Sequence, residues 1–79
     1  MPITVMLSTT LRTCVPGYNP VTGLCLDLPE SLTVGDLADR LGLPRGEIKI
    51  IMLNGRHAGF AQIVRDGDRI GYFPAVGGG

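Results

Sequence analysis

The stretch of residues 33–55, TVGDLADRLGLPRGEIKIIMLNG, contains a helix followed by a strand and decides the fold. Asp36 follows Thr33 by three positions, a pattern typical of a helix N-cap. Gly42 and Pro44 would end the helix. Between these signals, apolar residues recur at helical spacing: Val34, Leu37, Ala38 and Leu41. The sequence therefore predicts one short helix with a single apolar face that must be buried against another element.

An apolar run at residues 48–53 follows the helix and predicts a strand. Only Lys49 interrupts the run, and β-branched residues are frequent in it. Asn54-Gly55, directly behind it, is a strong signal for a hairpin turn. Residues 56–58 are therefore expected to turn back beside the strand.

Two further strands are predicted before the helix. Residues 3–7 alternate large aliphatic side chains with Thr4 and Met6, which is typical of a strand with one buried face. Residues 24–28 place leucines on one face and Cys25 on the other. Residues 12–23 lie between these strands and contain prolines and glycines, so they are expected to form a long loop.

The last strand is predicted at residues 69–73, after a turn at residues 66–68 (DGD) and before Pro74. The order is then strand, strand, helix, strand, short strand, strand. A mixed sheet of four to five strands packed on the helix would bury the apolar face of the helix. This is an α+β fold of the β-grasp, ubiquitin-like type. We predict one domain over residues 1–76 and a glycine tail over residues 77–79.

The charge balance excludes several classes of function. Seven basic side chains match seven acidic ones, so the formal net charge is zero. Neither a basic surface for nucleic acid nor a polybasic cluster for a membrane is expected. No apolar run approaches the ~20 residues that span a bilayer, and no targeting segment is recognisable, so we predict a cytoplasmic protein. Cys14 and Cys25 lack the spacing of a metal site and are expected to be free thiols.

The chain ends in residues 73–79, FPAVGGG, which leave the last strand for a tail without side chains. Terminal glycines cannot fill a core, and each costs roughly 0.5–1 kcal/mol more to order than alanine. A backbone without Cβ atoms can enter a narrow channel, and residues 76–79 can extend at most ~13–14 Å. The tail is therefore predicted to act outside the fold.

Three motifs occur together in this chain: NGRHA at residues 54–58, DGDRI at residues 66–70 and FPAVGGG at residues 73–79. In this order and spacing they resemble the MoaD/ThiS family of ubiquitin-like sulfur carriers over nearly the whole chain. The length and the long first loop look more like the molybdopterin synthase small subunit than like the thiamine carrier. Two features depart from the family pattern: Ala75 replaces a frequent second proline, and a third glycine precedes the usual pair.

The resemblance implies a carrier protein rather than an enzyme, or the non-catalytic small subunit of a molybdopterin synthase. An ionised carboxylate is a poor electrophile. An adenylating enzyme of the MoeB/ThiF type would therefore use ATP to activate the carboxylate of Gly79, which would then accept sulfur as a thiocarboxylate. Gly78 would precede the sulfur-carrying end, and Val76 and Gly77 would complete the tail.

The same resemblance implies the partners. The sulfur would pass to the large subunit of molybdopterin synthase, for a molybdenum or tungsten pterin, or to a thiazole synthase in thiamine synthesis. The chain itself would bind no cofactor and no metal.

Four residues are candidates for docking those partners. Phe73 matches the position of an apolar docking patch in the family, although either face of the last strand could point inward. His57 lies next to that patch and could equally be an ordinary hairpin side chain. Counted in strict alternation, Ile51 and Leu53 are expected to extend an exposed apolar face or to be covered by the first loop.

Two other functions stay open. A ubiquitin-like modifier would use the same activated Gly79, with a lysine amine as the attacking group. A β-grasp module that only binds a partner would not use the tail. A sulfur relay through Cys14 and Cys25 is less favoured than inert thiols, because nothing near either cysteine in the sequence indicates activation.

Overall fold

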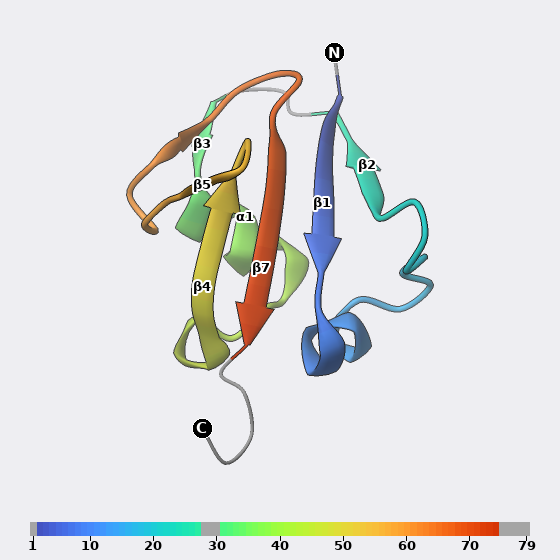
Figure 1. Ribbon diagram of the computed structural model, residues 1–79. Helices are drawn as coiled ribbons and strands as arrows, with labels where there is room; N and C mark the ends of the chain where they lie inside the picture. Colours follow the sequence, from blue (N-terminus) through green and yellow to red (C-terminus); the bar gives the residue numbers. More distant parts are fainter. Residues whose placement is uncertain (1, 28–30, 75–79) are drawn as a thin grey trace.

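The computed structural model describes residues 2–27 and 31–74, and its main element is a five-stranded mixed sheet. The strand order is β2-β1-β7-β4-β5, with β1 and β7 parallel and the other neighbouring pairs antiparallel (Figure 1). In chain order the strands are β1 Ile3–Leu7, β2 Leu24–Leu26, β4 Ile48–Leu53, β5 Arg56–His57 and β7 Arg69–Pro74. The predicted β-grasp arrangement is confirmed.

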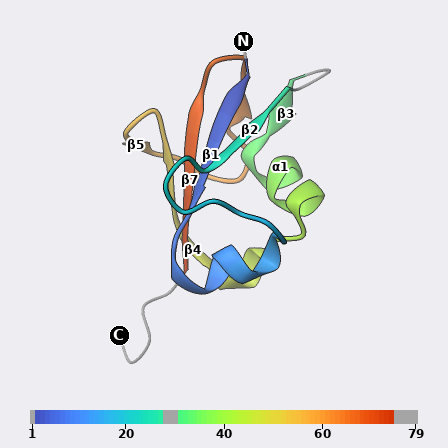
Figure 2. The same cartoon turned by 90° about the vertical axis from the view of Figure 1, so that its right-hand side faces the viewer.

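One helix, α1 at Val34–Leu41, lies against one face of this sheet, so the molecule has two layers (Figures 1 and 2). The Thr33 hydroxyl caps the helix by accepting a hydrogen bond of 3.0 Å from the Asp36 backbone N–H. Gly42 ends the helix with φ of 78°, a left-handed conformation that glycine adopts without strain. The predicted helix and both of its end signals are confirmed.

The apolar core lies between the helix and the inner face of the sheet. The alternation predicted for β1 is confirmed, because Ile3, Val5 and Leu7 are at most 2% exposed. Within the described residues, no polar or charged residue is buried. The core comprises Ile3, Val5, Leu7, Leu11, Val34, Leu37, Ala38, Leu43, Ile48, Ile51, Val64, Ile70 and Tyr72.

Several short elements were not predicted from the sequence. Strands β3, Leu32–Thr33, and β6, Ile63–Val64, form a separate two-stranded sheet. One 3₁₀ helix, η1 at Thr9–Cys14, occupies the start of the predicted first loop, and another, η2 at Arg45–Glu47, precedes β4. Strands of two residues and short 3₁₀ helices carry too little periodicity to be recognised in a sequence.

Ile51 and Leu53 were expected either to extend an exposed apolar face or to be covered by the first loop, and the exposed alternative is wrong. Ile51 is only 5% exposed and belongs to the core, and Leu53 packs against the core. The register of β4 against β7 shifts between Ile48 and Ile50, which is a β-bulge. Because one extra residue in a strand reverses its alternation, Ile48 and Ile51 both face inward although they are three positions apart. Ile50 consequently faces outward and is 43% exposed.

The two possible orientations of β7 are also resolved. Ile70 and Tyr72 are 1% and 0% exposed, so they form the inward pair. Phe73 is 36% exposed and lies on the outer face together with Gly71. The outward orientation expected for a docking role of Phe73 is therefore observed.

Candidate protein interaction site

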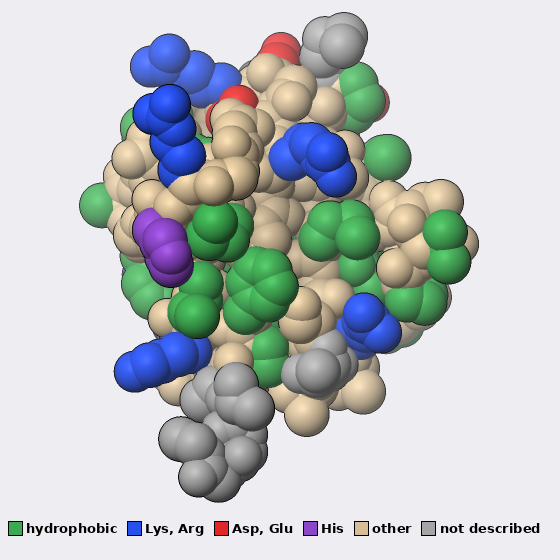
Figure 3. All heavy atoms as spheres, viewed as in Figure 1, with side chains coloured by type: hydrophobic (Ala, Val, Ile, Leu, Met, Phe, Trp, Pro, Cys, Tyr) green, Lys and Arg blue, Asp and Glu red, His purple; other side chains and the backbone are tan. Residues whose placement is uncertain are grey.

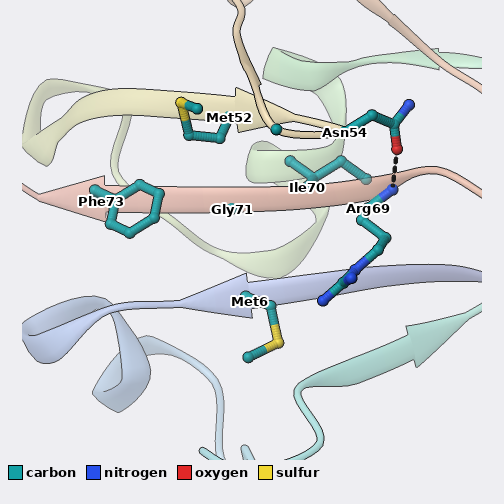
Figure 4. A pocket seen from close by; sticks show the side chains of 8 residues that line it. Met6, Met52, Asn54, Arg69, Ile70, Gly71 and Phe73 are labelled. Atoms are coloured by element: carbon teal, nitrogen blue, oxygen red, sulfur yellow. Dashed lines mark hydrogen bonds between the residues drawn. The ribbon is translucent and has the colours of Figure 1, made fainter.

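The outer face of the sheet, opposite α1, carries a row of residues that the topology brings together from three strands. Gly71 on the central strand β7 is in register with Met52 on β4 and with Met6 on β1. We call these three residues the Met–Gly–Met row. Figure 4 shows the two methionines on either side of β7, with no side chain between them at Gly71. The row therefore has a gap at its centre.

Phe73 extends this row along β7. A Cβ atom added at Gly71 would lie 3.1 Å from Phe73 Cε1 and 3.4 Å from Phe73 Cζ. The ring thus lies close to Gly71 and partly covers its backbone. Ile50 is the cross-strand neighbour of Phe73 and is also exposed. We define the outer patch as Met6, Ile50, Met52, Gly71 and Phe73.

An open depression of about 570 Å³ lies within this face. Its apolar lining comes from the Met–Gly–Met row, Phe73 and Ile70, and Arg69, Asn54 and Gly55 line the end near the β4–β5 turn. Figure 4 shows the Arg69 side chain running from β7 in the direction of Met6. The depression is thus mainly apolar with a cation at one side.

Basic side chains surround the outer patch. Figure 3, which looks onto this face, shows blue side chains spread around the green patch and red side chains only near the top. The carboxylates of Asp36 and Asp39 lie on α1, and Glu47 lies on η2. The chain as a whole has no net charge, but basic side chains predominate on the face that Figure 3 shows.

The two turns predicted at residues 54–55 and 66–68 are joined to each other by hydrogen bonds. The Asn54 side-chain amide donates to Asp68 Oδ1 at 3.0 Å, and the Arg69 backbone N–H donates to Asn54 Oδ1 at 2.9 Å. The backbone N–H of Thr4 donates to the carbonyl oxygen of Asp68 at 3.0 Å. These bonds connect the β4–β5 turn to the start of β7 and to β1. They help to hold in register the three strands that build the outer patch.

A buried hydrogen bond secures the inner side of β7. The Tyr72 hydroxyl donates to the Val34 carbonyl oxygen at 2.7 Å, where α1 begins. Burial raises the pKa of Tyr72 well above its ordinary value of 10.0, so the hydroxyl stays protonated and remains a donor at neutral pH. The strand that carries Phe73 outward is therefore anchored to the helix on its other side.

The predicted docking residues occupy different places. Phe73 lies in the outer patch, and His57 is exposed on β5 opposite Met52. The purple histidine adjoins green side chains in Figure 3. Sequence reasoning missed Met6, Ile50 and Met52 as members of the patch. For Met6 the alternation of β1 was a usable signal, whereas the bulge that turns Ile50 and Met52 outward has no signature in this sequence.

Other predicted features can be placed more briefly. Cys14 is half-buried, Cys25 is exposed, and both are free thiols. Among residues 2–27 and 31–74, no three His, Cys, Asp or Glu side chains gather as metal ligands would. No helix in the described part of the chain has the length and apolarity to cross a membrane. The predicted tail, Val76, Gly77, Gly78 and Gly79, lies outside the described residues, as does Leu28 of the predicted second strand.

Solved structures with the same architecture confirm the class of this fold. The chain is 21% identical to small archaeal modifier protein 1 from Haloferax volcanii, covering 95% of this chain and 98% of that one, with a TM-score of 0.70. It is 23% identical to a protein assigned as molybdopterin converting factor subunit 1 from Pyrococcus furiosus, with coverage of 96% and 99% and a TM-score of 0.68. The fold therefore defines a ubiquitin-like β-grasp protein.

A third structure has a higher sequence identity. The chain is 29% identical to a thiamine biosynthesis protein from Geobacter metallireducens, with coverage of 100% of this chain and 88% of that one and a TM-score of 0.59. No curated protein sequence matches the chain.

A family model identifies the chain more narrowly. The model for Mut7-C ubiquitin matches residues 1–77, nearly the whole length, so the chain belongs to this family. Together with the structural neighbours, this match confirms the resemblance to the MoaD/ThiS group of ubiquitin-like proteins.

Proposed function

We propose that this chain is a ubiquitin-like sulfur carrier whose terminal Gly79 carboxylate is activated and converted to a thiocarboxylate. The observation that best supports the proposal is how β7 is anchored and where it ends. This strand is anchored to α1 through Tyr72, presents Phe73 on the outer patch and runs into Pro74. Only five residues, AVGGG, separate Pro74 from the end of the chain, a reach of at most ~17–18 Å. A partner docked on the outer patch would thus have the carboxylate within reach.

The proposed chemistry has two stages. A carboxylate oxygen of Gly79 attacks the α-phosphorus of ATP in a partner enzyme of the MoeB/ThiF type, and pyrophosphate leaves. A persulfide sulfur of a donor protein then attacks the acyl carbon, and AMP leaves. A thiol finally cleaves the S–S bond of the resulting acyl disulfide, which leaves the thiocarboxylate on Gly79 and a disulfide on the donor. In this proposal the chain itself binds neither ATP nor metal.

The proposed receiver of the sulfur is the large subunit of a molybdopterin synthase, in molybdenum or tungsten pterin synthesis. The motif spacing of the tail supports this receiver, and so does the fold shared with the Pyrococcus furiosus protein. The 29% identity to a thiamine biosynthesis protein supports a thiazole synthase as the alternative receiver. A pull-down from the native host that recovers one of these two synthases distinguishes the pathways.

A protein modifier is the second candidate function, because the fold is shared with small archaeal modifier protein 1. Intact-mass spectrometry of the chain isolated from its host separates the two. A gain of about 16 Da, the exchange of one oxygen for sulfur, supports the carrier. Conjugates joined through lysine isopeptide bonds support the modifier.

The decisive variants are Gly79→Ala and a chain with one alanine added after Gly79. Both leave residues 2–74 unchanged and are expected to fold normally while losing the 16 Da gain. Val21→Ala serves as the matched control, since Val21 is 85% exposed and lies far from the tail in sequence. An undiminished thiocarboxylate yield in both tail variants would refute the carrier function.

A further inference from the structure

We propose that the depression over Gly71 is a socket for one apolar side chain of a protein partner, and that Arg69 selects a partner with a carboxylate beside that side chain. This inference rests on the proposed function for its biological setting. It adds the chemistry of the surface that the partner must present.

The shape of the socket follows from the sheet register. Met52 and Met6 stand on the two strands beside Gly71, and the missing side chain at Gly71 leaves the space between them open. Phe73 closes one end, since its ring lies within 3.1 Å of the position that a Cβ atom on Gly71 would take. Arg69, two residues before Gly71 on the same outer face, lies at the other end. A single side chain inserted there would contact apolar groups on three sides.

The side chains that line the socket are suited to binding an apolar side chain of a partner. Phe73 lines the socket and is 36% exposed, and its cross-strand neighbour Ile50, which lies beside the socket, is 43% exposed. Each gains stabilisation when a partner removes its surface from water. Methionine side chains are unbranched and polarisable, so they adapt to guests of different shape. A carrier that docks on an activating enzyme and on a synthase needs such an adaptable surface.

The charged side chains around the socket indicate which group the partner carries beside the inserted apolar side chain. Among residues 2–27 and 31–74, no carboxylate forms an ion pair with Arg69. Arg45 on the helix side provides a contrast, because it binds both oxygens of Asp39 at 2.9 and 3.1 Å and lies 5.2 Å from the Phe60 ring centre. The Arg69 guanidinium therefore has the donors to bind a partner carboxylate, and the basic rim in Figure 3 favours an acidic partner surface.

The test uses the full chain labelled with ¹⁵N and two synthetic peptides, Glu-Glu-Leu-Glu-Glu and Lys-Lys-Leu-Lys-Lys, as probes in NMR titrations. The acidic peptide is expected to shift the amide signals of Met6, Met52, Gly71 and Phe73, and the basic peptide is expected to leave them unchanged. A Glu-Glu-Gly-Glu-Glu peptide, without the apolar guest, is expected to bind more weakly. Equal shifts with the acidic and the basic peptide, or shifts confined to α1, would overturn the proposal.

Two variants locate the effect. Arg69→Glu is expected to raise the dissociation constant of the acidic peptide about two- to fivefold, the contribution of one exposed ion pair. Gly71→Val is expected to abolish binding, because its side chain fills the socket and displaces the Phe73 ring, which lies 3.1 Å from the added Cβ position. Arg65→Glu is the control, because Arg65 is an exposed arginine of the preceding turn that does not line the depression.

Further outcomes separate the socket from its alternatives. If Gly71→Val fails to fold, Arg69→Glu alone still decides the selection of carboxylates. Signals of the outer patch that shift with protein concentration before any peptide is added would identify a second copy of the chain as the occupant and overturn the proposal. Thiocarboxylate formation is measured on the same samples. Its absence with peptide selectivity intact refutes the carrier function alone, and its presence without peptide selectivity refutes the socket alone.

Discussion

Large side chains on the inner and outer faces of the five-stranded sheet differ in burial and in their bonding partners. On the inner face, Ile70 and Tyr72 are almost completely buried, and the Tyr72 hydroxyl has a partner in α1. On the outer face, Phe73 follows directly after Tyr72 yet is 36% exposed, and Arg69 has no ion-pair partner in the described part of the chain. Residues of the same strand thus serve stability on one face and remain available for binding on the other.

The difference shows how a chain of 79 residues combines a packed core with an exposed apolar face. A small domain has few apolar residues and needs most of them for its core. This chain nevertheless leaves several large apolar side chains on one face, and they are contiguous. Because exposed contiguous apolar surface is unfavourable in water, its position beside the start of the tail supports a role in docking.

The strongest test of this comparison truncates one side chain of the core beneath the inner face and one side chain of the outer patch. Leu37→Ala removes a core side chain that is 1% exposed, and we expect it to lower the free energy of unfolding by about 2–5 kcal/mol. Phe73→Ala is expected to cost no more than ~1 kcal/mol, the scale of one aromatic cross-strand pair with Ile50. Urea denaturation measures both values. Equal losses for the two variants would show that the outer patch is a structural part of the fold.

The connection between the two turns is the next target. Asn54→Ala removes two side-chain hydrogen bonds, to Asp68 and from the Arg69 backbone, and places alanine at a φ of 53°. We expect a loss of roughly 1–2 kcal/mol by the same denaturation measurement. Asn54→Gly is the control for the backbone, since glycine tolerates this φ but makes neither bond. Asn54→Gly as stable as the wild type would show that these hydrogen bonds do not hold the register of the outer patch.

A smaller effect on stability is expected from removing a hydroxyl on the inner face in one variant and adding one on the outer face in another. Tyr72→Phe removes the buried bond to the Val34 carbonyl oxygen and should lower the free energy of unfolding by about 1 kcal/mol. Phe73→Tyr adds a hydroxyl at the exposed neighbouring position and should change stability by less than about 0.5 kcal/mol. Thermal unfolding of both variants gives the comparison. An opposite order of the two effects would contradict the assignment of inner and outer faces.

The smallest expected effect is a pH dependence confined to the helix side. Hydrogen bonds from Arg45 lower the pKa of Asp39 below its ordinary value of 3.8, although both side chains are exposed. A lowered folded-state pKa means that the stabilisation is fully present above pH 3.8 and is lost as the pH falls through the folded-state value. The stability difference between the wild type and Asp39→Asn should therefore shrink in acid. Urea midpoints measured across this range provide the check, and a difference that grows in acid would contradict it.

Most elements of the fold could be predicted from the sequence because their signals are local. The Thr33 cap, the helical spacing up to Leu41 and the glycine at position 42 all act within a few residues, and the structure confirms them. The Asn54-Gly55 turn is equally local, and both of its residues have positive φ, 53° and 81°. The two-residue strands β3 and β6 could not be predicted, because only their pairing with each other defines them.

The residues of the outer patch were predicted only in part. Phe73 was expected in an apolar docking patch on the basis of the family motif, with His57 beside that patch, and both residues are exposed in the structure. For Ile51 and Leu53, the exposed alternative is wrong because strict alternation does not hold across the bulge between Ile48 and Ile50. The role of all four residues in docking stays a prediction.

The sequence by itself determined the helix with its caps and the turns, because each depends on residues within a short segment. Only the tertiary structure decided which face of β7 turns inward, where the bulge reverses β4 and which residues meet around Gly71. The physical reason is that Met6, Met52 and Gly71 come from distant parts of the chain and are brought together by strand register. Register depends on how the whole apolar core packs, and no single segment of the sequence specifies it.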